Sequence, residues 1–135
     1  MHRILVIDDE QDVRDGIKRV LERTGFSVRV VDSAADAMLE LERVGADVVI
    51  TDIIMPKVSG VDAIGRIVRE FPLVRIVAIS GGGNFDVTGH LPASITTTAY
   101  LTAAKRAGAH CILTKPFESR QLIEAVNQVM GTGAP

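Results

Sequence analysis

Several polar residues capable of chemistry stand directly after short apolar runs in this 135-residue sequence. They are Asp8 and Asp9, Asp52, Ser80, and Thr114 with Lys115. The set combines three carboxylates, two hydroxyls and one ammonium group. Two carboxylates at about 4 Å repel each other by several kcal/mol at an effective dielectric constant of about 20. A cluster of this kind is therefore expected to surround a cation.

Oxygen ligands alone favour a hard divalent cation, Mg²⁺ or Mn²⁺. His2, His90 and His110 are isolated in the sequence and lack the spacing of a zinc site, so we interpret them as surface or structural residues. A site with few protein carboxylates leaves coordination positions for water and phosphate oxygens. Lys115 and Ser80 can bond the remaining phosphate oxygens. The set therefore indicates phosphoryl transfer to a carboxylate, with an aspartyl phosphate as the product.

The elements that must position these residues follow from an alternation of β-branched runs with segments of helical period. Strands are predicted at residues 4–7, 27–31, 47–51, 74–79 and 109–114. Helices are predicted at residues 10–24, 33–44 and 61–71, in a segment that ends near 107, and at 117–130. Parallel βαβ units result, and the simplest solution is a flavodoxin-like doubly wound α/β fold with five helices and strand order 2-1-3-4-5. The carboxyl ends of its strands share one edge, where the polar residues should converge.

The composition argues against several classes of function. A net charge of −2 provides no basic field toward nucleic acid or anionic membrane, and aromatic residues make up only 4% of the chain. No apolar run is long enough for a signal sequence or a membrane span, and the single Cys111, expected in the core, suits a reducing compartment. We expect one cytoplasmic domain over residues 1–130, followed by a disordered tail at 131–135.

Four segments resemble the signature segments of response-regulator receiver domains. They are Ile7-Asp8-Asp9-Glu10, Thr51-Asp52-Ile53-Ile54-Met55-Pro56, Ile79-Ser80-Gly81 and Leu113-Thr114-Lys115-Pro116-Phe117. Each segment alone is a weak or moderate signal, but the four together, at the ends of the first, third, fourth and fifth predicted strands, are highly specific. Their order and spacing match the family from residue 3 to about 130.

The resemblance implies a role for each matching residue. Asp52 is expected to accept the phosphoryl group, Lys115 to contact it, and Ser80 to be the switch hydroxyl that moves to bond it. Asp9 is expected to ligate Mg²⁺ directly, and Asp8 directly or through water. The full set of metal ligands implied by the family is Asp8, Asp9, Asp52 and the backbone carbonyl of Ile54.

The resemblance also implies a mode of action for a single-domain receiver in a two-component system. A histidine kinase or histidine phosphotransfer protein would donate the phosphoryl group, and the output would be contact with an unidentified downstream protein. No separate substrate is expected to turn over, so the chain is not expected to be an enzyme. We expect a monomer or weak dimer, with neither nucleic acid nor membrane as a partner. The start at Met1 favours an N-terminal receiver, while a fragment of a larger regulator stays open.

Three features depart from the pattern of the family. Ile112 stands three residues before Lys115, where receivers usually carry Tyr or Phe as the second half of the switch. Ile54, two residues after the expected acceptor, is apolar, which predicts slow hydrolysis of the aspartyl phosphate. The segment 81–98 is longer than the fold needs, and its Gly81-Gly82-Gly83 start allows close approach to a phosphate or a reshaped partner face.

Two other functions stay open at this point. A receiver that binds proteins independently of phosphorylation is compatible with Ile112. A phosphatase with an aspartyl nucleophile is disfavoured, because such enzymes commonly carry Asp-x-Asp after the first strand and Asp8 and Asp9 are adjacent. Taken singly, the acidic residues could also cap helices or loops, Ser80 could be a turn residue, and Lys115 could be a solvated lysine.

Overall fold

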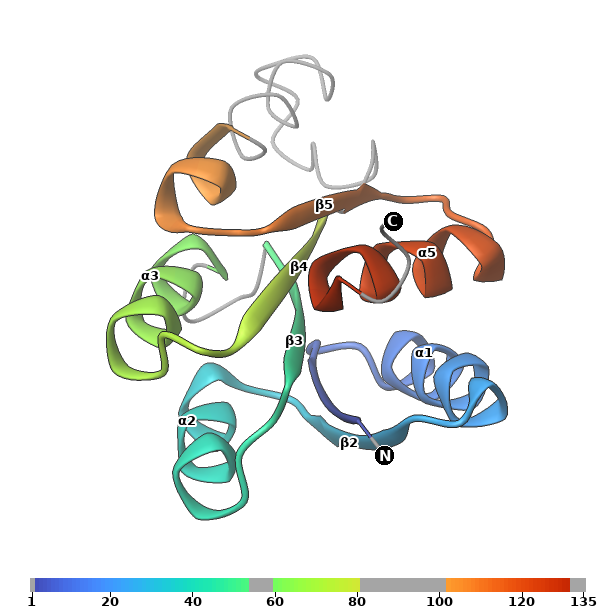
Figure 1. Cartoon of the computed structure of the whole chain (residues 1–135), viewed down its shortest axis with the longest axis horizontal. Coiled ribbons are helices and arrows are strands. Elements are labelled where there is room, and N and C mark those ends of the chain that lie inside the picture. The colour runs from blue at the N-terminus through green and yellow to red at the C-terminus, as the bar shows by residue number, and fades with distance from the viewer. Residues whose placement is uncertain (1, 54–59, 81–101, 132–135) are drawn as a thin grey trace.

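The computed structural model describes residues 2–53, 60–80 and 102–131 of the chain. Its centre is a five-stranded parallel sheet with the order β2-β1-β3-β4-β5, as the sequence predicted (Figure 1). The strands are β1 (Arg3–Ile7), β2 (Ser27–Val31), β3 (Val48–Asp52), β4 (Arg75–Ser80) and β5 (Cys111–Thr114). All four neighbouring pairs run parallel, so every strand presents its carboxyl end at the same edge of the sheet.

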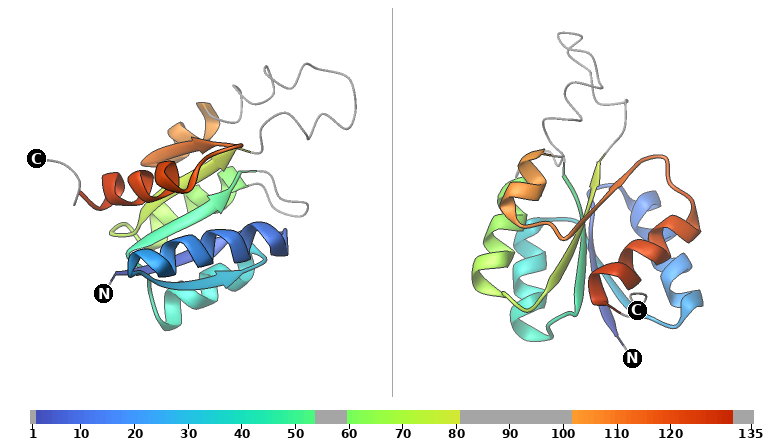
Figure 2. Two further views of the ribbon diagram at one scale, coloured as in Figure 1. Left: turned by 90° about the vertical axis from the view of Figure 1, so that its right-hand side faces the viewer. Right: turned by 45° about the horizontal axis from the view of Figure 1, so that its top comes forward.

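Helices cover both faces of this sheet, as a doubly wound fold requires (Figure 2). The helices with complete bounds are α1 (Gln11–Thr24), α2 (Ala34–Arg43), α3 (Gly60–Glu70) and α5 (Ser119–Met130), and residues 102–107 form a further helix. Helices α1 and α5 lie on one face, whereas α2, α3 and the helix at 102–107 lie on the other (Figure 1). The five predicted helices and the flavodoxin-like class are thus confirmed.

The strands feed two apolar clusters because successive side chains point to opposite faces. On β1, Ile4 and Val6 join the cluster beneath α1 and α5, whereas Leu5 and Ile7 join the cluster beneath α2 and α3. All four side chains are fully buried, and burial of such a side chain stabilises the fold by about 1.5–3 kcal/mol. The uninterrupted apolar run of residues 4–7 is therefore buried on both faces of the sheet, at the centre of the core.

Side-chain caps set where two of the helices begin. The Ser33 hydroxyl accepts a hydrogen bond from the backbone N–H of Asp36 at 3.1 Å, which confirms the predicted start of α2. At α5, the Glu118 side chain accepts from the backbone N–H of Gln121, and the Glu118 N–H donates to Gln121 Oε1 at 2.7 Å. This capping box starts α5 at Ser119, two residues later than the sequence predicted.

Strand β5 also begins two residues later than predicted. The N–H of Ala109 donates to the Ala104 carbonyl at 3.0 Å and closes the end of the helix at 102–107. The N–H of His110 then donates to the Ile76 carbonyl at 2.9 Å, and the paired ladder starts at Cys111. His110, predicted to lie inside the strand, is the residue that precedes it.

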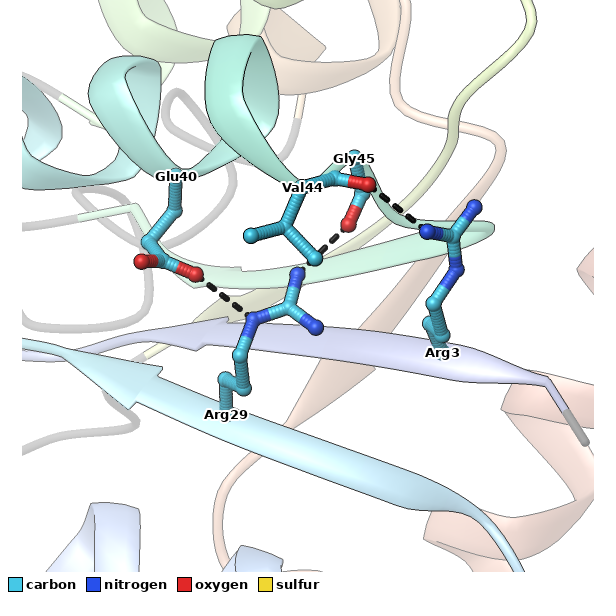
Figure 3. A network of polar contacts seen from close by, with 5 residues as sticks. All are labelled: Arg3, Arg29, Glu40, Val44 and Gly45. Carbon is cyan, nitrogen blue, oxygen red and sulfur yellow. Dashed lines mark hydrogen bonds and ion pairs between the residues drawn. The ribbon is translucent and has the colours of Figure 1, made fainter.

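Two arginines hold the turn after α2 against the sheet (Figure 3). Arg29 Nε lies 2.6 Å from a carboxylate oxygen of Glu40, and a second guanidinium nitrogen donates to the Gly45 carbonyl at 2.5 Å. Arg3 donates to the Val44 carbonyl at 2.6 Å. The Val44 and Gly45 carbonyls lie just past the end of α2 and have no partner within the helix, so these bonds satisfy acceptors that would otherwise need water. They lie near the edge where β1 and β3 begin, opposite the edge formed by the strand ends.

Candidate functional site

The register of the sheet brings the two aspartates at the ends of β1 and β3 to one level. Ile7 pairs with Thr51, so Asp8 and Asp52, the next residue on each strand, lie on neighbouring strands at about 4.8 Å spacing. The N–H of Asp8 donates to the Val31 carbonyl at 3.2 Å, which continues the pairing with β2 past the end of β1. Parallel pairing alone therefore places these two carboxylates side by side.

The register of β4 and β5 adds the hydroxyl and the ammonium group at the same edge. Ser80, the last residue of β4, pairs with Thr114 and is 2% exposed. The N–H of Lys115 donates to the Ser80 carbonyl at 3.1 Å, so the lysine is anchored beside the end of β4. The Lys115–Pro116 peptide bond is cis.

Asp8 is a buried carboxylate, and one of its oxygens has no hydrogen-bond partner among the described residues. The residue is 1% exposed, and its Oδ1 accepts the backbone N–H of Glu10 at 2.8 Å. Its Oδ2 is buried and has no hydrogen-bond partner within the part of the chain that the structure describes. Burial raises the pKa of Asp8 above its ordinary value, and the charges of Asp9 and Glu10 raise it further. The Glu10 N–H and the charge of Lys115 oppose this rise in the pKa.

A buried carboxylate oxygen without a partner is what an oxygen-liganded cation would satisfy. Asp8, Asp9 and Glu10 each offer a carboxylate oxygen, and these three atoms lie within 4.8 Å of one another. The donor set contains oxygen alone, which fits Mg²⁺ or Mn²⁺ and does not fit a zinc site. Glu10 was not predicted to belong to this cluster. Its position directly after Asp8 and Asp9 in the sequence could have indicated it.

Asp52 lies at the buried end of β3. It is 5% exposed and follows Thr51, which is fully buried and whose hydroxyl donates to the Asp52 carbonyl at 3.0 Å. Lys115 is half-buried, and its charge lowers the pKa of Asp8 against the effect of burial. The structure thus brings together Asp8, Asp9, Asp52, Ser80 and Lys115 at one edge. The expected carbonyl ligand Ile54 lies outside the described residues.

Ile112 packs against the cluster that contains Ala104 and Ala109, on the face covered by α2 and α3. The position where the family usually carries an aromatic switch side chain is therefore filled by a half-buried aliphatic one. The glycine-rich segment that precedes it, residues 81–98, lies outside the part of the chain that the structure describes.

The single cysteine and the described histidines, His2 and His110, lie at the edge of the core, at the surface or in structural hydrogen bonds. Cys111 is half-buried against the cluster beneath α1 and α5, so it lies at the edge of the core. His110 Nδ1 accepts the backbone N–H of Ile76 at 3.0 Å, which supports the structural interpretation. His2 is exposed, with its Nδ1 3.9 Å from an oxygen of Asp47. Among the described residues, no helix is long and apolar enough to cross a membrane.

Comparison with known proteins gives a consistent result. The sequence matches the family model described as "Response regulator receiver domain" over residues 4–127. It is 35% identical over 130 residues to an uncharacterized 14.6 kDa protein of Leptolyngbya boryana, a match that covers 93% of this chain and 87% of the relative. It is 28% identical to the chemotaxis protein CheY of Thermotoga maritima, covering 94% of this chain and 96% of that protein.

A solved structure gives the same result. The crystal structure of a response regulator receiver domain protein from Clostridium thermocellum superposes with a TM-score of 0.77 at 32% identity, covering 97% of this chain and 95% of that chain. Other relatives are longer. The chain spans 53% of the sensory transduction protein RegX3 of Mycolicibacterium smegmatis and 25% of the DNA-binding transcriptional regulator NtrC of Azospirillum brasilense.

Proposed function

This chain belongs to the response-regulator receiver family, and we propose that it is a phosphorylation switch whose phosphoryl group is carried on Asp52. Receiver domains of this family are signalling modules of two-component systems that interact with histidine kinases, and they generally bind Mg²⁺ at an acidic pocket. The observation that carries the proposal is the edge of the sheet itself. A buried Asp52 lies there beside Asp8, whose second oxygen has no partner among the described residues, and Lys115 supplies positive charge to that edge.

The proposed reaction is transfer from the phosphohistidine of a histidine kinase or histidine phosphotransfer protein. A carboxylate oxygen of Asp52 attacks the phosphorus and forms a P–O bond, while the P–N bond of the donor breaks and its electron pair returns to the imidazole nitrogen. The ammonium group of Lys115 bonds a phosphoryl oxygen and offsets its charge. The hydroxyl of Ser80 donates to another phosphoryl oxygen once the group is in place.

The residues that would hold Mg²⁺ are Asp8, Asp9 and Asp52, with the backbone carbonyl of Ile54 as the family resemblance implies. When bound, the ion supplies positive charge that neutralises the acidic residues and the phosphoryl oxygens. Asp8 would contribute its Oδ2, since its Oδ1 accepts the N–H of Glu10 and its Oδ2 has no partner among the described residues. Glu10 lies close enough to join the cluster, directly or through water.

A second function is favoured by one observation. Ile112 fills the position of the usual aromatic switch residue and is packed against the core. A receiver without that side chain can bind a partner through a surface that phosphorylation does not change. In either case we propose that the output is a contact with a downstream protein. The proposed domain spans residues 1–130 and acts as a monomer or weak dimer.

Phosphorylation of the whole chain by a small acyl phosphate tests the proposal. Incubation with acetyl phosphate and Mg²⁺, followed by intact-mass measurement, should show the gain of one phosphoryl group. The gain should vanish in Asp52→Asn and in the presence of EDTA, and it should persist in the matched variant Asp47→Asn at the opposite edge of the sheet. Phosphate retained by Asp52→Asn would overturn the assignment. Absence of any gain, from acetyl phosphate and from a phosphorylated histidine kinase alike, would favour the phosphorylation-independent binding module.

A further inference from the structure

Arg14 reaches back from helix α1 to the segment that carries the acidic cluster. One of its guanidinium nitrogens donates to the backbone carbonyl of Asp8 at 2.7 Å, in a partly buried position. The bond spans six residues, so it joins the first turns of α1 to the end of β1. Neither the sequence pattern nor the proposed chemistry assigned a role to this arginine.

The shape of the acidic segment explains why such a bond is needed. In an extended chain, successive side chains point to opposite sides. The carboxylates of Asp8, Asp9 and Glu10 nevertheless lie within 4.8 Å of one another, so the backbone must turn sharply immediately after β1. Without fixed hydrogen bonds, the repulsion among three carboxylates would favour a more open arrangement of this turn.

Three hydrogen bonds around Asp8 hold this turn, and each has a different source. The Asp8 N–H is fixed to the Val31 carbonyl of β2, and the Asp8 side chain accepts the N–H of Glu10 in a local turn. The third bond, from Arg14, fixes the Asp8 carbonyl and with it the plane of the peptide between Asp8 and Asp9. The direction in which the Asp9 side chain leaves the backbone depends on that plane.

We propose that Arg14 is a positioning residue of the cation site, which orients the Asp8–Asp9 peptide so that neighbouring carboxylates can share one divalent ion. The inference rests on the proposed function, since it assumes that the ion binds at this edge. Arg14 itself does not contact the ion, because a cationic side chain is no ligand. Its effect passes through the backbone carbonyl, in the way that outer-shell hydrogen bonds orient metal ligands.

The test measures binding of Mn²⁺ to the full chain by electron paramagnetic resonance of the free ion. Arg14→Met keeps the aliphatic part of the side chain but lacks the guanidinium group, so it removes the bond to the Asp8 carbonyl. We expect it to weaken Mn²⁺ binding by about tenfold, the lower end of the effect of removing an outer-shell partner. Arg14→Lys, which retains a donor, should recover part of the affinity. If Arg14→Met does not fold, Arg14→Gln replaces it, because its amide is too short to reach the carbonyl.

Two further variants make the outcomes decisive. Arg3→Met removes the same kind of bond, from a guanidinium to the Val44 carbonyl, at the opposite end of β1, and should leave the affinity for Mn²⁺ unchanged. Asp9→Asn should abolish tight binding. Unchanged affinity in Arg14→Met together with a loss in Asp9→Asn would overturn the role of Arg14 and leave the proposed function standing. Equal weakening in Arg14→Met and Arg3→Met would also overturn it, whereas unchanged affinity in Asp9→Asn would overturn the metal site itself.

Discussion

The buried carboxylate of Asp8 lowers the stability of the metal-free fold, yet it is one of the groups proposed to bind the cation. Its pKa is raised, chiefly by burial, so the folded protein favours the protonated form. A raised pKa in the folded state contributes stability at low pH, and this contribution is lost as the pH rises through the raised pKa. Above the raised pKa the metal-free fold therefore carries the cost of a buried negative charge, which a bound cation would offset.

Replacement of Asp8 by Asn should stabilise the metal-free protein. The Asn side chain can still accept the Glu10 N–H, but it carries no charge to bury. We expect calorimetry in EDTA at pH 7 to show a Tm higher by about 3–6 °C, the shift that corresponds to ~1 kcal/mol in a domain of this size. Addition of Mg²⁺ should raise the Tm of the unsubstituted protein more than that of Asp8→Asn. In EDTA, where no ion binds, the exposed Asp9→Asn is the control, and a lower Tm for Asp8→Asn would contradict this account.

At the scale of the elements, His110 joins β5 to β4 through its side chain. Its Nδ1 accepts the N–H of Ile76, which requires that nitrogen to be unprotonated. Burial lowers the pKa of His110, and the neighbouring charges of Arg75 and Lys105 lower the pKa further. When the pH falls below the ordinary histidine pKa, the unfolded chain takes up a proton that the folded protein resists, so the contribution of His110 to stability is lost toward low pH.

His110→Asn should reduce the pH dependence of stability. The Asn side chain offers an oxygen in place of Nδ1 and does not titrate. Urea unfolding of the unsubstituted protein should show a smaller free energy of unfolding at pH 5 than at pH 7, and the difference should shrink in His110→Asn. Comparison of the two proteins removes the effect of the other titrating groups. His2→Asn controls for the loss of any histidine, and an unchanged difference in His110→Asn would refute the idea.

The contact between α3 and the end of the helix at 102–107 depends on a glycine. Gly108 has a φ of 123°, and a Cβ at this position would lie 2.7 Å from a methyl carbon of Val68. Gly108→Ala should therefore lower the free energy of unfolding by roughly 2–4 kcal/mol, from backbone strain and overpacking. Gly16→Ala, inside α1 where a Cβ meets no atom within 4 Å, should raise it by about 0.5–1 kcal/mol. Denaturant unfolding that ranks the two variants in the opposite order would contradict the packing described here.

The elements were predictable from sequence where the signal is local. The apolar run at residues 4–7 and the helical period after it depend on side-chain type alone, so the succession of strands and helices followed from such patterns. The strand order followed from the choice of the simplest doubly wound arrangement. The starts of β5 and α5 were placed two residues too early, because Ala109 bonds back to Ala104 and Glu118 serves as a cap. Both are hydrogen bonds between particular atoms, which a hydrophobic period does not record.

The candidate site was predictable in the residues at the strand ends, but not in the residue that orients them. Asp8, Asp52, Ser80 and Lys115 could be grouped because each ends or directly follows a strand, and parallel strands end at one edge. The part played by Arg14 could not be predicted, since its reach across the first turns of α1 to the Asp8 carbonyl depends on tertiary geometry. The sequence therefore identified the groups proposed for chemistry better than the groups that orient them.

For the molecule as a whole, the lifetime of the phosphorylated state would decide how the proposed switch is used. Ile54 is an apolar residue where the family positions a side chain that influences the attacking water, so the phosphoryl group on Asp52 should persist for much longer than seconds. Ile54→Asn, with a polar group able to bond water, should shorten the lifetime several-fold. The measurement is the intact mass followed over time after removal of acetyl phosphate. Complete loss within seconds in the unsubstituted protein would contradict the prediction.

The bonds from Arg3 and Arg29 to the turn after α2 have a consequence for how such a chain can diverge (Figure 3). They anchor the sheet at one edge, and the acidic residues occupy the other. A lineage can therefore vary the edge proposed for chemistry while these hydrogen bonds at the opposite edge stay unchanged. Duplicated copies of such a gene could diverge in this way from the start, because the hydrogen bonds of Arg3 and Arg29 lie apart from the residues proposed for chemistry.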